Sequence, residues 1–386
     1  MGFASFERYQ HRFNAYGFQF HPIRPDLDIG SPELVRKVMN AQDGVAFLFK
    51  ELVFSQIEQA YEDLCDVLQN YDLLISGMLA PAARLVFEAV NKPWISSFLF
   101  PSQMYSVYDF PVLPPLPSIS KVLSLHPLSA RFLKEIVANE ISKWCEPIYD
   151  FRKKLGLKKG PNPLIEGFHS PLLSVGLFSN FFSRPQADWP VSCRLSAFIF
   201  QEQGLPSQEL SVEIKDFVKK HPQPIVVTLG SIAGLSSKTF YRDLAQALKE
   251  LKQHAIFVTG LPDKVLDDFS EILEVSYAPF NELLPLSKAV FHQAGIGTLA
   301  QTLKSLKASL CFPLGLDQYD NANRLQKLGV ALAFPFHKLN SNNARTVVQK
   351  FMQELPHLEA NAMQLGEEIG SENGVELSCQ LIQPYL

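Results

Sequence analysis

Residues Tyr277 to Leu325 read YAPFNELLPLSKAVFHQAGIGTLAQTLKSLKASLCFPLGLDQYDNANRL, and this stretch decides the fold of the chain. A short apolar strand, Ala289 to Phe291, ends in His292 and is followed at once by the turn Ala294-Gly295-Ile296-Gly297. Thr298 then opens an amphipathic helix that continues to Lys304. A strand that passes through small residues into a helix N-terminus makes an anion site, because unpaired N–H groups and the positive end of the helix dipole converge there.

A second strand in the same stretch, Ser309 to Phe312, ends in Pro313-Leu314-Gly315-Leu316-Asp317-Gln318. Folds of the α/β class bind ligands at the edge of the sheet where the parallel strands end. We therefore expect the carboxylate of Asp317 and the amide of Gln318 to lie beside the anion site. An anion cradle next to a carboxylate–amide pair suits a diphosphate that carries a sugar.

The composition is that of a large α/β protein. The chain has 386 residues, which predicts two domains because single cores stop growing near ~250–300 residues. Apolar residues make up 47% of the chain, enough for a substantial core. The formal charge of −4, without any run of Lys or Arg, argues against a nucleic-acid partner.

The cysteines and the apolar runs bear on the compartment. Five cysteines lie far apart and form no C-x-x-C motif, so we expect reduced core residues in a cytoplasmic protein rather than disulfides or a zinc site. No apolar run reaches the ~20 residues that span a bilayer, and the first residues have no secretory signal. Peripheral contact with a membrane surface stays open.

Apolar strands alternate with amphipathic helices in both halves of the chain, a pattern that indicates βαβ units and parallel sheets. The predicted strands include Tyr71–Ser76, Trp94–Phe100, Pro224–Leu229 and Ala255–Thr259, and the predicted helices include Pro81–Val90, Leu128–Leu155, Phe240–Leu251 and a final helix His357–Gln383 with a break at Glu372-Asn373-Gly374. Phe110 to Pro117 is too rich in proline for regular structure and suits a loop over a cleft. We predict a first domain over residues 1–200, a linker over 201–222 and a second domain over 223–386.

The segment quoted above resembles the donor-binding motif of the two-domain (GT-B) nucleotide-sugar glycosyltransferases of family 1, the UDP-glycosyltransferases, in the branch of bacterial and fungal sterol and macrolide glucosyltransferases. That pattern reads roughly H-H-G-G-A-G-T, then a strand, then P-L-x-x-D-Q-x-x-N-A. The matching residues are His292, Gly295, Gly297, Thr298, Pro313, Leu314, Asp317, Gln318, Asn321 and Ala322. Gln293 and Ala294 depart from this pattern, which has His and Gly at these positions. Gln keeps a hydrogen-bond donor, and Ala only restricts the backbone conformations that Gly allows.

The resemblance implies a GT-B fold, in which two Rossmann-like parallel-sheet domains face a cleft and the last helix crosses back onto the first domain. It implies a UDP-sugar as co-substrate, with no metal ion and no other cofactor. It assigns the diphosphate to Gly230, Ser231, His292, Gly295, Gly297 and Thr298, the uracil and ribose to Tyr277, Pro279 and Phe280, and the sugar to Asp317 and Gln318.

Each of these residues taken alone also fits a structural role. His292 would then be a hydrogen-bonded core histidine, Asp317 a helix N-cap, and Tyr277 and Phe280 core aromatics. Their order and spacing together favour nucleotide-sugar binding.

One part of the family pattern has no counterpart. Members begin with a strand, a glycine-bearing turn that supplies the catalytic base, and a helix, whereas this chain opens on a helical segment, Phe6 to Tyr16, followed by the strand Phe18 to Pro22. A β-α-β unit of roughly 30–40 residues is therefore missing, and Gly77 stands where many members have an Asp. The catalytic base is unassigned, because the spacing of His21 and His126 supports neither. Either the start lies upstream or the chain is truncated, and the apolar strands that remain favour the former.

We therefore predict a transferase that moves a hexose, with glucose favoured, from a UDP-sugar to a hydroxyl of a lipophilic acceptor such as a sterol, carotenoid, lipid or polyketide. The reaction would invert the anomeric centre and need no metal ion. The alternative is a truncated donor-binding pseudoenzyme or regulatory protein without transferase activity. A lipid-linked cell-wall glycosyltransferase is a third hypothesis, but it calls for a more basic first domain. The identity of the acceptor and the oligomeric state stay open.

Overall fold

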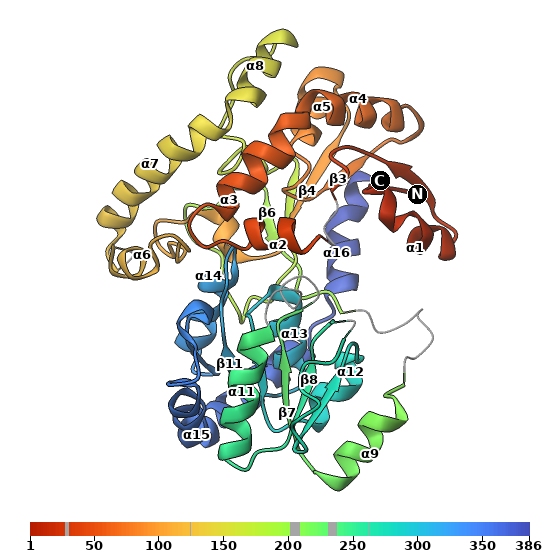
Figure 1. Cartoon of the computed structure of the whole chain (residues 1–386). Helices are drawn as coiled ribbons and strands as arrows, with labels where there is room; N and C mark the ends of the chain where they lie inside the picture. The colour runs from red at the N-terminus through yellow and green to blue at the C-terminus, as the bar shows by residue number, and fades with distance from the viewer. Residues whose placement is uncertain (28–30, 124, 201–208, 231–237, 262) are drawn as a thin grey trace.

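The computed structural model describes residues 1–27, 31–123, 125–200, 209–230, 238–261 and 263–386. The chain forms two halves, one above the other in Figure 1, and each half is built on a parallel β-sheet flanked by helices. The prediction of an α/β fold with two parallel sheets is confirmed.

The sheet of the second half has six strands, and all neighbours are parallel. Their spatial order is β12 (Ala331–Ala333), β11 (Ser309–Cys311), β10 (Val290–His292), β7 (Ile225–Thr228), β8 (Ala255–Val258) and β9 (Ile272–Val275). The chain forms β7 first, adds β8 and β9 on one side, and then returns to add the other three on the opposite side. The order therefore reverses between β7 and β10, and open α/β sheets bind ligands at such a switch point.

Helices cover both faces of this second sheet. They are α9 (Val212–Lys220), α11 (Lys238–Glu250), α12 (Phe280–Leu283), α13 (Ile296–Lys304), α14 (Gln318–Lys327) and α15 (Ala344–Gly370), whereas the last helix, α16 (Gly374–Ile382), packs on the first sheet. Val227 and Phe257 belong to one core cluster with α11, α13 and α15. Their sequence neighbours Val226 and Ile256 point to the other face and pack with α9 and α12. This double burial explains why the strands read as continuous apolar runs.

The first half contains a smaller parallel sheet in the order β3 (Leu74–Ser76), β4 (Trp94–Phe98), β5 (Leu173–Gly176) and β6 (Cys193–Leu195). Its helices are α2 (Pro32–Val38), α3 (Gly44–Phe47), α4 (Ile57–Val67), α5 (Ala82–Val90), α6 (Pro117–Leu123), α7 (Pro127–Trp144) and α8 (Glu146–Lys154). A π-helical segment, Leu48–Val53, follows α3.

The N-terminus differs from the predicted opening helix. A strand, β1 (Gly2–Ser5), comes first and pairs in parallel with β2 (Gln19–Pro22), and the helical part is shortened to a 3-10 turn (Glu7–Tyr9) and α1 (Gln10–Ala15). Phe3 of β1 stacks on Phe13 of α1 with ring centroids 4.3 Å apart. Aromatic packing therefore stabilises β1, although its sequence Gly-Phe-Ala-Ser has little preference for a strand.

One further prediction needs correction. The segment Leu128–Leu155 is not one helix but two, α7 and α8, because Pro147 lies in the first turn of α8 and has no N–H with which to continue α7. The described part of the segment predicted as a linker, residues 201–222, contains α9, whose Ile214 is buried against the second sheet. Residues 201–208 of that linker lie outside the described residues.

The last two helices connect the halves. α15 begins at Ala344 rather than at the predicted His357, and neither it nor any other helix of the described residues is long and apolar enough to cross a membrane. The chain breaks at the predicted position, where the side chain of Asn373 caps α16. α16 then packs on the first sheet, and the hydroxyl of Tyr385 donates to the carbonyl of Leu172 at 3.0 Å.

Candidate functional site

The candidate site residues lie along the edge of the second sheet where its parallel strands end. From one side to the other, this edge carries Tyr277 after β9, Gly230 after β7, the turn after β10 and Asp317 after β11. Strands lie about 4.8 Å apart, so these four segments span about 20 Å of the edge, with the switch point between them. The structure thus brings together residues that lie far apart in the sequence.

His292 ends β10 and is completely buried. Its Nδ1 accepts a hydrogen bond from the N–H of Ala294 at 3.0 Å, which leaves the proton on Nε2, 3.0 Å from Oγ of Ser309. Burial lowers the pKa of the imidazole to about 3, so the ring is neutral. Because both nitrogens are used inside the protein, the ring holds the turn, and its position does not support the predicted direct contact with a diphosphate.

The N-terminus of α13 is open to a ligand. Gly295 is the N-cap residue and has no side chain with which to cap the first N–H groups of the helix. A Cβ on Gly297 would meet nothing within 4 Å, and Thr298 is nearly buried beside it. Uncapped N–H groups, the helix dipole and the open space at Gly297 together suit an anion.

Gln293 fills the space between the turns after β7 and β10. A Cβ on Gly230 or on Gly295 would come within 2.3 or 2.8 Å of its Nε2, so a side chain at either position would displace this amide. Gly230 also has a φ of +73°, which favours glycine. The Oε1 of Gln293 is buried without a hydrogen-bond partner in the described part of the chain. Ser231, predicted beside Gly230, lies outside the described residues.

Ala294 adopts a φ of +66°, a left-handed conformation that costs a residue with a Cβ about 1–2 kcal/mol. Its carbonyl accepts a hydrogen bond from Nδ2 of Asn321 at 3.0 Å. The same amide donates to Oδ2 of Asp317 at 2.6 Å. One fully buried side chain therefore ties the turn after β10 to the start of α14, a role for Asn321 that the sequence motif alone did not indicate.

Asp317 and Gln318 begin α14 but face different surroundings. Asp317 is the N-cap residue, its side chain does not cap the helix, and burial raises its pKa to about 6. Gln318 is buried, and its Oε1 accepts a hydrogen bond from the N–H of Leu314 at 2.9 Å. Its Nε2 lies 4.0 Å from Sδ of Met39 in the first half. Gln318 therefore holds the preceding turn, and of its amide only the nitrogen is left for the predicted sugar contact.

The three residues predicted to hold a nucleoside differ in exposure. Tyr277 is 63% exposed, whereas Pro279 is buried and Phe280, the first residue of α12, packs against the core. An exposed aromatic ring offers its face to a planar base. Pro279 and Phe280 are placed to support the turn that carries this ring.

A large apolar cavity of about 360 Å³ opens next to Asp317. Its lining comprises Val45, Leu48, Phe49, Gly77, Met78, Leu79, Ser97, Leu99, Phe100, Ser102, Gln103, Tyr105, Pro111, Val112, Leu113, Pro114, Ile141, Trp144, Leu164, Leu316 and Asp317. The predicted proline-rich loop thus borders a cleft. Asp317 is the only carboxylate among the described residues of the lining, so the end of the sheet edge that carries it opens directly on an apolar space.

The histidines considered as replacements for the catalytic base lie elsewhere. Nε2 of His21 is 2.9 Å from the hydroxyl of Tyr71, and His126 caps α7 by accepting the N–H of Leu128. Neither belongs to the described lining of the large cavity. The structure therefore gives both a structural role.

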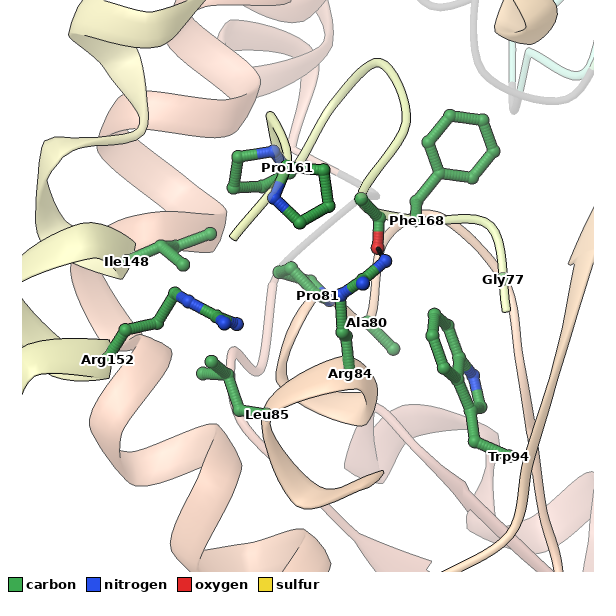
Figure 2. Close-up of a pocket in the computed structure, with 12 residues that line it drawn as sticks. Gly77, Ala80, Pro81, Arg84, Leu85, Trp94, Ile148, Arg152, Pro161 and Phe168 are labelled. Carbon is green, nitrogen blue, oxygen red and sulfur yellow. Dashed lines mark hydrogen bonds between the residues drawn. The ribbon is translucent and has the colours of Figure 1, made fainter. Parts of the chain in front are cut away.

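A second cavity, inside the first half, is too small for a substrate (Figure 2). It encloses about 20 Å³, room for about one water molecule. Arg84 and Arg152 reach its wall, and both pair with Glu88, with Nε of Arg84 2.6 Å from the carboxylate. This buried ion cluster belongs to the first half alone.

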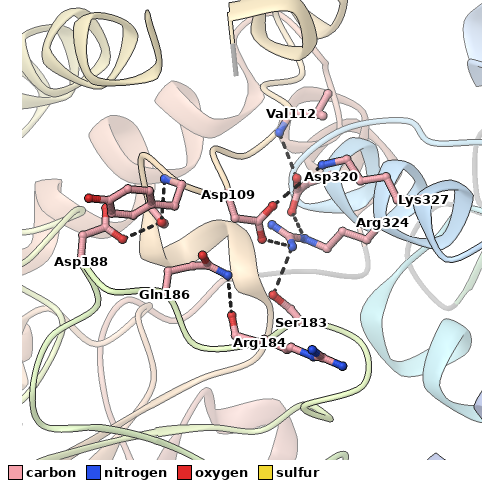
Figure 3. Close-up of polar contacts among 11 residues, drawn as sticks. Asp109, Val112, Ser183, Arg184, Gln186, Asp188, Asp320, Arg324 and Lys327 are labelled. Carbon is pink, nitrogen blue, oxygen red and sulfur yellow. Dashed lines mark hydrogen bonds and ion pairs between the residues drawn. The ribbon is translucent and has the colours of Figure 1, made fainter. Parts of the chain in front are cut away.

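A different ion cluster joins the two halves (Figure 3). Arg324 of α14 pairs with Asp320 of the same helix at 2.7 Å and with Asp109 on the loop before the cavity, and it donates to Oγ of Ser183 at 3.1 Å. Asp320 also accepts the N–H of Val112 at 3.0 Å. Burial opposes the charge of Arg324, but the two carboxylates outweigh it and raise the pKa of the guanidinium. We name these residues the α14 clamp, because they fix the cavity loop to the helix that begins at Asp317.

Sequence reasoning missed the clamp. The spacing of Asp320 and Arg324, four residues apart on one helix, indicates an ion pair within α14. Nothing in the sequence indicates that Asp109 completes it.

Relatives of known sequence match most of the chain. A family model described as UDP-glucoronosyl and UDP-glucosyl transferase matches residues 174–372, just over half of the chain. The O-mycaminosyltylonolide 6-deoxyallosyltransferase of Streptomyces fradiae is 25% identical over 376 residues, which cover 94% of this chain and 85% of that protein. The sterol 3-beta-glucosyltransferase of Aspergillus oryzae is 24% identical over 333 residues, which cover 81% of this chain and only 23% of that protein.

Solved structures with the same fold extend over almost the whole chain. The glycotransferase of kitacinnamycin superposes with a TM-score of 0.67 at 15% identity, over 99% of this chain and 90% of that chain. The glycosyltransferase VinC, in complex with dTDP, superposes with a TM-score of 0.63 at 17% identity, over 98% of this chain and 90% of that chain. These similarities confirm the predicted GT-B fold.

Replacing Ala294 by Gly tests the strain in the turn after β10. Glycine adopts a φ of +66° without steric cost, so Ala294→Gly should leave the free energy of unfolding unchanged or raise it by up to about 1 kcal/mol. The control is Ala300→Gly inside α13, which should lower the free energy of unfolding by about 1 kcal/mol. Urea denaturation followed by circular dichroism measures both, and an equal loss in the two variants would contradict the strain.

Removing one charge from the α14 clamp tests the coupling of the halves. Asp109→Asn should lower the free energy of unfolding by about 1–3 kcal/mol, because Arg324 stays buried with one carboxylate fewer. It should also speed hydrogen exchange in the loop around Val112 and in α14, since the link between them is weakened.

Glu88→Gln is the matched control for this experiment. Glu88 pairs with Arg152 inside the first half, and its side chain is 21% exposed, like that of Asp109. Glu88→Gln should cost similar stability and leave exchange in α14 unchanged. If mass spectrometry shows the same exchange in α14 for both variants, the clamp does not couple the halves.

Proposed function

Because the chain belongs to the UDP-glucuronosyl and UDP-glucosyl transferase family, we propose that it transfers a hexose, with glucose favoured, from a UDP-sugar to a hydroxyl of a lipophilic acceptor. The main support is the order in which three parts of the site follow one another along the sheet edge. An exposed aromatic ring, an anion cradle and a carboxylate follow one another over about 20 Å, in the order of base, diphosphate and sugar in the donor.

The proposed chemistry follows from the charges at this edge. The acceptor oxygen attacks the anomeric carbon from the side opposite to UDP, a new C–O bond forms, and the bond to the phosphate oxygen breaks with inversion. The departing diphosphate takes up negative charge, which the uncapped N–H groups at the start of α13 and the helix dipole stabilise. The acceptor proton passes to a base that faces the cavity. This scheme assigns the charge stabilisation to the protein and calls for no metal ion.

The large cavity supports an apolar acceptor. Its wall is built mainly from aliphatic and aromatic side chains, and Asp317 marks the point at which it meets the donor edge. A cavity of about 360 Å³ falls within the size of small-molecule sites, roughly 300–1,000 Å³. The curated relatives named above act on a macrolide and on sterols by their names, and such rigid, apolar alcohols fit this wall.

A second candidate function is donor binding without transfer. One observation favours it: the described lining of the cavity contains no histidine. Incubation with UDP-glucose and a panel of sterols and macrolides, followed by mass spectrometry of the acceptors, separates the two. A mass gain of one hexose supports the transferase, whereas UDP-glucose binding without any transfer supports the second function.

Adding a methyl group to Gly297 tests the anion cradle. Gly297→Ala should raise the free energy of unfolding by up to about 1 kcal/mol through helix propensity. It should also weaken UDP binding at least about tenfold, because the methyl group occupies the space in which we place the diphosphate.

Gly370→Ala in α15 is the matched control, since a Cβ there also meets nothing within 4 Å. It should leave UDP affinity unchanged. Calorimetric titration with UDP compares the variants. Equal affinities would show that the diphosphate does not bind at the start of α13.

Replacing Asp317 by Asn tests the sugar contact. Asn still accepts the hydrogen bond from Asn321, so the fold should persist, and UDP, which lacks the sugar, should bind as before. UDP-glucose should bind about tenfold or more weakly, because hydrogen bonds to a charged group are worth ~1.5–3 kcal/mol. With a pKa of about 6, Asp317 is mainly ionised above pH 6, so transfer by the unaltered protein should fall below that pH.

The pH profile and the affinities together locate Asp317. In Asp317→Asn, the fall of the transfer rate below about pH 6 should disappear. If UDP-glucose affinity is unchanged while transfer is lost, Asp317 acts on the acceptor rather than on the sugar. If neither changes, Asp317 has no part in the reaction.

A further inference from the structure

The helices α6 and α7 carry an unusual set of bare apolar side chains. Seven large apolar residues in this region are between 47% and 82% exposed: Leu116, Ile119, Val122, Leu125, Leu128, Phe132 and Ile136. Ile119 and Val122 lie three residues apart in α6, and Leu128, Phe132 and Ile136 lie four residues apart in α7, so each set shares one face of its helix. Leu116 precedes α6, and Leu125 lies between the two helices. We name this set the apolar ridge. Figure 1 shows both helices at the outside of the first half.

The ridge is not a gap in the core, because α7 already has a packed face. Ala130 and Leu133 are buried and form a cluster with Val107 and Phe110. The residues of the ridge point the other way. Soluble proteins seldom leave a contiguous apolar surface of this kind without a partner.

The charges around the ridge favour an anionic partner. Between Leu116 and Ile136 the basic residues are Lys121, Arg131 and Lys134, and the only acidic residue is Glu135. The chain as a whole carries a formal charge of −4, whereas the net charge of this segment is positive. Amphipathic helices with apolar and basic residues bind the interface of anionic bilayers.

Segments next to the ridge in sequence line the large cavity. Leu113 and Pro114, just before α6, line the cavity, and so do Ile141 and Trp144 near the end of α7. Helix α7 therefore presents part of the ridge to solvent and also forms part of one wall of the apolar space. A lipophilic molecule in a bilayer would meet the ridge first and the cavity next.

We propose that the apolar ridge docks the protein on the surface of an anionic lipid bilayer. The side chains of the ridge enter the interface between headgroups and acyl chains, and Arg131 and Lys134 contact the headgroups, whereas Lys121 lines a cavity beside α14. In this position the bilayer delivers the acceptor to the cavity, a consequence that rests on the proposed function. The docking itself does not depend on that function.

Sedimentation with lipid vesicles tests the docking. The full chain should sediment with vesicles of phosphatidylcholine and phosphatidylserine, and less with vesicles of phosphatidylcholine alone. Phe132→Glu should weaken the binding at least about tenfold, because one large apolar side chain is no longer buried in the bilayer. Val191→Glu is the control, because Val191 is 91% exposed outside the ridge and the change in charge is the same.

The outcomes decide between partners. Vesicle binding that Phe132→Glu lowers and Val191→Glu does not lower supports docking. No binding to either kind of vesicle, or equal binding by the two variants, overturns it. Analytical ultracentrifugation that shows a dimer, which Phe132→Glu converts to a monomer, with no vesicle binding, assigns the ridge to a second copy of the chain and also overturns docking.

Two readouts keep this test separate from the proposed function. Circular dichroism and UDP titration should be the same for the two variants, because both substitutions lie on the surface. A protein that binds vesicles but transfers no sugar refutes the transferase and leaves docking intact. Transfer to a water-soluble acceptor without any vesicle binding refutes docking alone.

Discussion

The burial of the six-stranded sheet on both faces is the constraint on which the rest of the structure depends. Parallel strands such as β7 and β10 need helices above and below, and this arrangement sends every strand toward the same edge. Each turn at that edge then contributes one part of the site. The reversal of strand order between β7 and β10 keeps the crossing helices away from the switch point, so that Gly230 and Gly295 can approach a ligand with their backbones.

The second level of organisation runs through α14. At its start, Asn321 joins Asp317 to the carbonyl of Ala294, so the position of the carboxylate depends on the turn after β10. One turn later, Arg324 joins the helix to Asp109 and thus to the loop that borders the cavity. A single helix therefore sets the donor edge and the cavity wall relative to each other. Asn321 and Arg324 are buried, and buried hydrogen bonds and ion pairs are costly to leave incomplete.

The strands of the second half could be predicted from sequence, because burial on both faces makes β7 and β10 continuous apolar runs. Contacts across long separations could not. Arg324 and Asp109 are 215 residues apart, and no local pattern joins them. The motif also predicted His292 at the site but not the direction of its ring, which depends on Ser309 of the neighbouring strand. Whether a polar side chain faces a ligand or the core is decided by such neighbours.

Gln293 and Ala294, the two departures from the family motif, act at one point. A strained backbone at Ala294 and an unpaired buried acceptor on Gln293 each cost on the order of 1–3 kcal/mol. Costs of this kind persist where the surrounding structure enforces them, and they cluster at functional sites. Turning the amide of Gln293 by half a rotation exchanges its oxygen and nitrogen, so that the same side chain presents either an acceptor or a donor between the two glycine turns. A glutamine can therefore stand where the family motif has a histidine and still present a hydrogen-bond donor.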